Sequence, residues 1–223
     1  MRRIESPNFD ARPDEGPIDI LVLHYTGMET GEMALERLCD STAKVSAHYL
    51  IHENGDALQL VEEKYRAWHA GVAAWRGNTD INARSIGIEL VNPGHEFGYR
   101  EFPETQLIAL ESLCLEILTR HDIPARNIVG HSDVAPTRKQ DPGELFPWQR
   151  LASKNIGIWP RQLGGMSASM DHVAALFSLY GYETENLLSA VAAFQRHFRP
   201  ERVDGIADAE TLGRLRGLIR QAK

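Results

Sequence analysis

The chain has 223 residues, of which 43% are hydrophobic and 25% are charged, as in ordinary globular proteins. The formal net charge is −7 and the Lys and Arg residues are scattered, which argues against a surface that binds nucleic-acid phosphates. No apolar run is long enough to span a membrane. The length suits one large domain with a small appended module.

The first residues contain two arginines but no apolar stretch, so we expect no signal peptide. The sequence therefore predicts a cytoplasmic protein, with the periplasm or cell envelope as the alternative if an export signal has been removed. Cys39 and Cys114 lie among apolar residues at helical spacing and are expected to be reduced core thiols. Nothing in the sequence indicates an oligomeric state.

Strand and helix patterns alternate in the first part of the chain. Residues 18–26 are rich in β-branched and large apolar residues and predict a buried strand with His24 at its C-terminal end. Residues 31–41 predict a helix with Met33 on its apolar stripe. Residues 45–61 predict two strands joined by an Asn-Gly turn.

The same alternation continues to about residue 155. Residues 85–92 predict a strand with Glu89 in its middle, and residues 103–120 predict a long amphipathic helix that begins with proline. A short strand follows at residues 127–131. Strands interleaved with helices around a buried sheet predict an α/β (α+β) fold.

The pattern changes beyond this core. A stretch rich in Gly, Pro and Ser predicts a linker over residues 157–168, and three amphipathic segments predict a small three-helix domain over residues 169–223. The first domain then covers residues 1–156. His172 and His197 fall in the helical domain and are expected at its surface.

Ionisable residues gather in the stretch "GHSDVAPTRKQDPG", residues 130–143. Three predicted strands deliver His24, Glu89 and His131 into polar surroundings. Two histidines with one carboxylate suit a catalytic Zn²⁺, which keeps three protein ligands and leaves the fourth position to water. An ionised Glu89 among apolar strand residues also needs a compensating charge, which a metal ion would supply.

Five blocks, in order, resemble one known family: "ILVLHYT", "VSAHYLI", "WHAG", "SIGIELVN" and "VGHSDVAPTRKQDPG". They are similar to the zinc-dependent N-acetylmuramoyl-L-alanine amidases of the AmpD and AmiD type, whose fold peptidoglycan-recognition proteins and phage T7 lysozyme share. The resemblance implies a central mixed β-sheet flanked by helices. The tail, with "LYGY", "AVAAFQRHF" and "VDGIADAETLGRL", resembles a three-helix peptidoglycan-binding domain.

The resemblance implies a role for each of five residues. His24, His131 and Asp141 would bind Zn²⁺, Glu89 would be the catalytic acid or base, and Lys139 would stabilise developing negative charge. The enzyme would cut the amide bond between the lactyl group of N-acetylmuramic acid and L-alanine. The expected partner is therefore peptidoglycan or a muropeptide. A polymer-binding tail favours intact cell wall, whereas the missing signal peptide favours soluble anhydro-muropeptides.

Two positions leave alternatives open. Asp133 competes with Asp141 as the third ligand, but it lies only two positions after His131 and would be strained to share the same ion, so we favour Asp141 and expect Asp133 to orient the loop. The phage lysozyme has a catalytic tyrosine where this chain has Ala47, so Glu89 would carry that task alone.

The substrate groove is expected in the loop that contains Trp68, His69, Trp75 and Arg76, because indole rings stack on sugars and arginine pairs with carboxylates. His48 is a further candidate for substrate contact, with core packing as the alternative. A Trp-anchored loop without a ligand is the alternative for the whole segment.

Two other functions compete with the amidase. A peptidoglycan-recognition protein would bind without turnover, but such proteins usually lack a full ligand set. A zinc peptidase would trim the stem peptide, and peptidases also carry this kind of tail.

Overall fold

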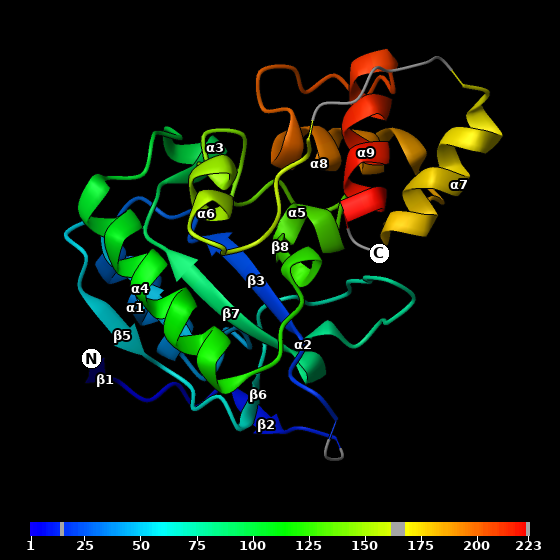
Figure 1. The fold of residues 1–223 in the computed structure, drawn as a ribbon. Coiled ribbons are helices and arrows are strands. Elements are labelled where there is room, and N and C mark those ends of the chain that lie inside the picture. Colours follow the sequence, from blue (N-terminus) through cyan, green and yellow to red (C-terminus); the bar gives the residue numbers. More distant parts are fainter. Residues whose placement is uncertain (14–15, 162–167, 222–223) are drawn as a thin grey trace.

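The computed structural model describes residues 1–13, 16–161 and 168–221 (Figure 1). Its centre is a six-stranded mixed sheet in the order β1-β5-β4-β7-β3-β8. In chain order these strands are β1 (Arg2–Arg3), β3 (Ile20–Tyr25), β4 (Tyr49–Ile51), β5 (Ala57–Gln59), β7 (Ser85–Leu90) and β8 (Ile128–Gly130). A small second sheet pairs β2 (Phe9–Ala11) with β6 (Tyr65–Ala67). The predicted mixed sheet is confirmed.

Helices cover the sheet. In the first part of the chain they are α1 (Gly31–Cys39), α2 (Ile81–Arg84), α3 (Gly94–Phe97), α4 (Glu104–Arg120), the 3-10 helix η1 (Ala125–Asn127), α5 (His131–Val134) and α6 (Trp148–Ser153). The C-terminal part, here called the helical module, contains α7 (Met170–Tyr180), α8 (Leu187–Phe198) and α9 (Ala209–Gln221). The three helices predicted there are confirmed. Among the described residues, no helix has the length and apolar character that a membrane crossing requires.

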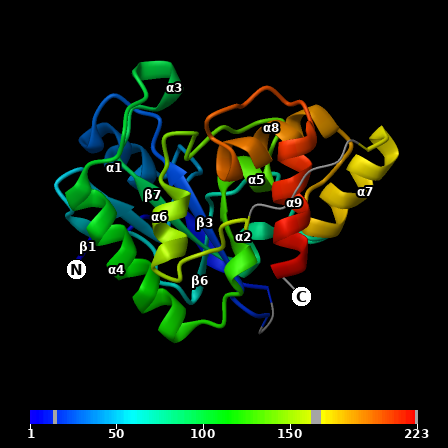
Figure 2. The same ribbon diagram turned by 45° about the horizontal axis from the view of Figure 1, so that its top comes forward.

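Strand β3 is buried on both faces, as expected for a central strand between parallel neighbours. Leu21 and Leu23 pack with residues of α4, whereas Ile20 and Val22 belong to the same apolar cluster as residues of α7, α8 and α9. Figures 1 and 2 accordingly show the helical module and α4 on different sides of the sheet. The module therefore shares a hydrophobic core with the sheet.

The predicted linker is only partly described. Ile158 and Trp159 are partly buried against the core, and the Arg161 N–H donates to Gln221 Oε1 at 3.0 Å. Residues 162–167 of the predicted linker lie outside the described part of the chain. The exact domain boundaries stay a prediction.

Two details of the predicted core were wrong. Met33 is 43% exposed, because Ala34 and Leu38 form the buried stripe of α1 instead. Cys39 is only half-buried, whereas Cys114 is fully buried, and both are free thiols.

Candidate metal centre

Three neighbouring strands bring the site together. Strand β3 pairs in parallel with both β7 and β8, so the carboxyl ends of all three meet at one edge of the sheet. His24 lies opposite Glu89 in this register, and His131 directly follows β8 as the first residue of α5. The chain then returns, and the Ser132 N–H donates to the Asp141 carbonyl oxygen at 2.9 Å.

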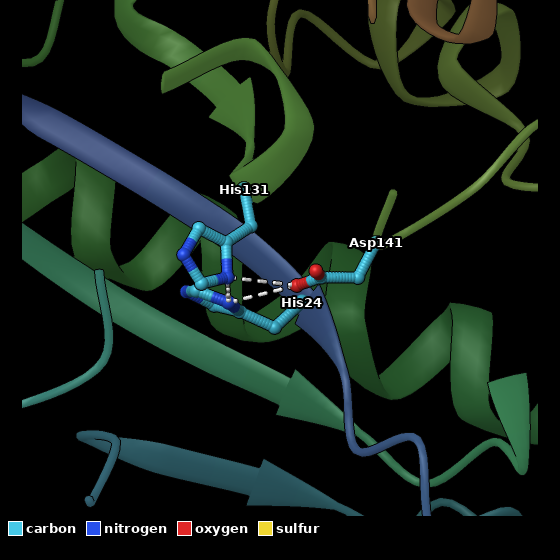
Figure 3. Close-up of side chains that lie close together, drawn as sticks. All are labelled: His24, His131 and Asp141. Atoms are coloured by element: carbon cyan, nitrogen blue, oxygen red, sulfur yellow. Dashed lines mark hydrogen bonds and ion pairs between the residues drawn. The ribbon is translucent and has the colours of Figure 1, made fainter. Parts of the chain in front are cut away.

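Figure 3 shows His24, His131 and Asp141 directed at one another. His24 Nδ1 lies 3.0 Å from His131 Nδ1 and 3.0 Å from Asp141 Oδ2, and the third separation is 3.1 Å. All three side chains are buried. Ligands of a tetrahedral zinc ion lie roughly 3.3 Å apart, so this donor set fits a metal ion.

The protonation states of His24 and Asp141 also suit metal binding. Burial, followed by the charge of His131, lowers the pKa of His24 to about 4, so the imidazole is neutral. Burial works against ionisation of Asp141, but the two neighbouring histidines hold its pKa well below the ordinary value. A neutral imidazole and an ionised carboxylate are the forms that bind metals.

The far side of each histidine is held by a second contact. His131 Nε2 lies 3.0 Å from the Ala70 carbonyl oxygen, which can only accept, so Nδ1 keeps its lone pair for the centre. His24 Nε2 contacts His69 Nδ1 at 3.1 Å, and His69 Nε2 contacts the Ser85 hydroxyl at 3.0 Å. These contacts fix the ring orientations.

Glu89 lies beside the donors and has one unpaired carboxylate oxygen. Its Oε2 atom is buried and makes no hydrogen bond within the described structure, and burial together with Asp141 raises the pKa of Glu89 well above its ordinary value. A cation in the adjacent site would compensate such a carboxylate. The unpaired oxygen is thus a second observation that fits a metal ion here.

His131, Asp141 and Glu89 line a cavity of about 440 Å³. Its lining includes Glu89, Lys139 and Asp141, so these three side chains share one cavity. Sequence reasoning missed Arg138, which also lines the cavity and donates to Ala70 O at 3.0 Å. No motif pointed to Arg138, because its role depends on a carbonyl group 68 residues away.

His95 and Tyr25 also line the cavity, and no sequence motif predicted this position for either residue. The Tyr25 hydroxyl contacts His95 Nδ1 at 2.8 Å, and His95 Nε2 contacts Glu144 Oε2 at 3.1 Å. The tertiary fold alone brings these three side chains together.

Most of the residues predicted to form the substrate groove do not line this cavity. Trp75 is 1% exposed and packs edge-on against Tyr182, so its indole has no free face for a sugar. Arg76 donates to the Tyr180 carbonyl oxygen at 2.9 Å. Both residues contact the helical module, and the burial of Trp75 contradicts its predicted place in the groove. Arg76 is exposed and does not line the cavity, and its contact with substrate stays a prediction. Trp68 is half-buried and does not line the cavity.

The two predicted groove histidines are internal. His69 is 5% exposed, and although it reaches the cavity wall, its ring nitrogens contact His24 and Ser85. Residue 87 has to be glycine because a Cβ there would lie 2.5 Å from the His69 ring. His48 is fully buried, and its Nδ1 accepts from the Gly87 N–H at 3.0 Å. It supports strand β7, and substrate contact by His48 was a wrong prediction.

Asp133 faces away from the cluster of metal donors. It accepts hydrogen bonds from Gly130 N at 2.7 Å and from the Tyr182 hydroxyl at 2.6 Å, and His197 Nδ1 lies 2.7 Å from it. The expected surface position of His197 was wrong, since the residue is 3% exposed. His197 follows Phe194 by three positions on α8, so both side chains lie on the same face of the helix, and this spacing indicated that His197 is buried.

A mixed sheet that brings two histidines and a carboxylate together at the carboxyl ends of its strands is consistent with a metal-dependent hydrolase. The family model for N-acetylmuramoyl-L-alanine amidase matches residues 14–144, and the model for a peptidoglycan binding domain matches residues 177–215. The chain belongs to the N-acetylmuramoyl-L-alanine amidase family. The family resemblance seen in the sequence is therefore confirmed.

Individual relatives agree with this assignment. The amidase AmiD of Escherichia coli is 40% identical over 222 residues, covering 87% of this chain and 79% of AmiD. The structure of AmiD with anhydro-N-acetylmuramic acid-L-Ala-D-gamma-Glu-L-Lys has a TM-score of 0.84 at 36% identity, covering 94% of this chain and 92% of AmiD. AmpDh3 of Pseudomonas aeruginosa with anhydromuramic pentapeptide has a TM-score of 0.84 at 32% identity, covering 99% of both chains.

Proposed function

We propose that this amidase is zinc-dependent and cuts the bond between the lactyl group of N-acetylmuramic acid and L-alanine in anhydro-muropeptides. The buried donor set of His24, His131 and Asp141, beside the unpaired Oε2 atom of Glu89, carries the proposal. The bound molecules in the AmiD and AmpDh3 structures, both anhydromuramic peptides, support the substrate class.

Each residue then has one task. His24, His131 and Asp141 would hold the zinc ion, which when bound lowers the pKa of a water molecule to about 7 and polarises a carbonyl group. Glu89 takes a proton from the attacking water and passes it to the leaving amide nitrogen. Lys139, on the same cavity wall, offers its ammonium group to the oxygen of the scissile carbonyl as negative charge develops there.

We expect the purified protein to release free stem peptide from a soluble anhydro-muropeptide. The activity should disappear with a chelator and return with added zinc, as mass spectrometry of the products will show. Full activity in chelator would contradict the zinc dependence. Loss of a terminal amino acid would instead indicate a peptidase, and tight binding without turnover a recognition protein. Intact sacculi, assayed in parallel, test whether the polymer is also a substrate.

Lys139→Ala is expected to lower kcat by about 10²–10³-fold while the zinc content stays at the wild-type level, because only the developing oxyanion loses its partner. Steady-state kinetics and metal analysis check this. Lys139→Arg should restore part of kcat, and the exposed Lys154→Ala is the matched control. A raised KM with unchanged kcat would place Lys139 in ground-state binding instead.

A further inference from the structure

A buried polar cluster connects the helical module to the turn that carries His131. The Asp133 carboxylate is 1% exposed and lies within hydrogen-bonding distance of Gly130 N, the Tyr182 hydroxyl and His197 Nδ1. An ionised carboxylate only accepts hydrogen bonds, so His197 donates from Nδ1. Two of these three donors come from the helical module, and without them a buried carboxylate would be poorly compensated.

His197 is itself held in place from both domains. Its ring stacks on Trp148 of α6 at 3.7 Å between centroids and on the neighbouring Phe198 at 3.7 Å. Figures 1 and 2 both show α5, which contains Asp133, next to α8, which contains His197. Stacking on the Trp148 and Phe198 rings therefore fixes the orientation of the imidazole that donates to Asp133.

The cluster adjoins two of the proposed metal ligands. Asp133 binds the N–H of Gly130, the residue directly before His131. The Ser132 N–H, between His131 and Asp133, donates to the Asp141 carbonyl oxygen at 2.9 Å. Trp148 closes the same region, since a Cβ at Gly130 would lie 3.3 Å from its ring. The turn at residues 130–133 thus determines where both His131 and Asp141 point.

We propose that Tyr182 and His197 of the helical module are positioning residues for the metal site. Through Asp133 they hold the turn that presents His131 and Asp141, so the module supports the catalytic centre as well as belonging to a peptidoglycan-binding family. The inference rests on the proposed function in taking His24, His131 and Asp141 as the zinc ligands.

Tyr182→Phe and His197→Leu test this in the full-length protein. Each removes one donor to Asp133 and keeps an apolar side chain in the core. We expect the zinc dissociation constant, measured by chelator competition, to rise about tenfold, the lower end of the usual effect of a supporting contact. The visible spectrum of the Co²⁺-substituted protein should change as well. His197→Asn, which keeps an N–H donor near the Nδ1 position, should restore much of the affinity.

Two further variants separate positioning from general destabilisation. Val191→Ala weakens the buried face of α8 but offers no polar atom to Asp133, so it should lower the melting temperature and leave zinc affinity and the Co²⁺ spectrum unchanged. In an Asp133→Asn background, Tyr182→Phe should have little additional effect, because the acceptor of its hydrogen bond has already been weakened.

Wild-type zinc affinity and an unchanged Co²⁺ spectrum in both Tyr182→Phe and His197→Leu would overturn the inference. An affinity loss that Val191→Ala reproduces at equal destabilisation would overturn it as well. A wild-type protein that binds no zinc would instead refute the proposed function, so the two failures are distinguishable.

Discussion

Asp141→Asn is expected to abolish stoichiometric zinc binding and to lower kcat/KM on an anhydro-muropeptide by more than about 100-fold, beyond the usual loss of a supporting contact. Asp141 supplies the only carboxylate of the donor set, and Oδ2 lies 3.0 Å and 3.1 Å from the two histidine nitrogens. A neutral amide removes the negative charge that compensates the ion in this buried site. Metal analysis of the dialysed protein and steady-state kinetics measure the two effects.

Asp56→Asn, in an exposed turn, is the matched control and should keep wild-type zinc content and activity. If Asp141→Asn kept its zinc while Asp133→Asn lost it completely, the third ligand would be Asp133. Asp133 instead points toward Tyr182 and His197, which favours Asp141 as the third ligand.

Glu89→Gln is expected to lower kcat by about 10²–10⁴-fold, the usual contribution of a positioned acid or base. Glutamine has nearly the same shape but cannot take a proton from water. Because Glu89 is not one of the three donors that converge, the zinc content should stay at the wild-type level. Single-turnover kinetics on a muropeptide, with metal analysis of the same sample, separate this result from that of Asp141→Asn.

The exposed Glu116→Gln on α4 is the control for Glu89→Gln and should leave kcat unchanged. A kcat close to wild type in Glu89→Gln would assign proton transfer to another group. Loss of zinc in this variant would show that Glu89 contributes to metal affinity and not only to turnover.

The spacing of apolar residues in the sequence predicted those helices and strands whose burial follows one regular pattern along their length. Strand β3 is buried along almost its whole length and helix α4 is buried at helical spacing, so both elements were predicted correctly. Helices α2 and α5 have only 4 residues each, too few for a helical period to show. The short helix α5, which begins at His131, was therefore not predicted.

The donor set could be predicted because its ordered blocks resemble a family, whereas contacts between the sheet and the helical module could not. A tryptophan that stacks on sugar and one that is buried by a distant helix have the same local sequence. Trp75 packs on Tyr182, more than 100 positions later, and nothing near Trp75 encodes that partner. His197 was misplaced for the same reason, since its acceptor Asp133 lies 64 residues earlier.

The shared core also affects how this chain acquires its structure during synthesis. Ile20, Val22 and Val129 form part of an apolar surface whose remaining members include Phe194 and Leu215, near the end of the chain. Chains grow from the N-terminus, so this surface is complete only after Leu215 and Leu218 of α9 have been made. Until α9 emerges, the nascent chain presents an unfinished apolar face to the translation machinery and its chaperones.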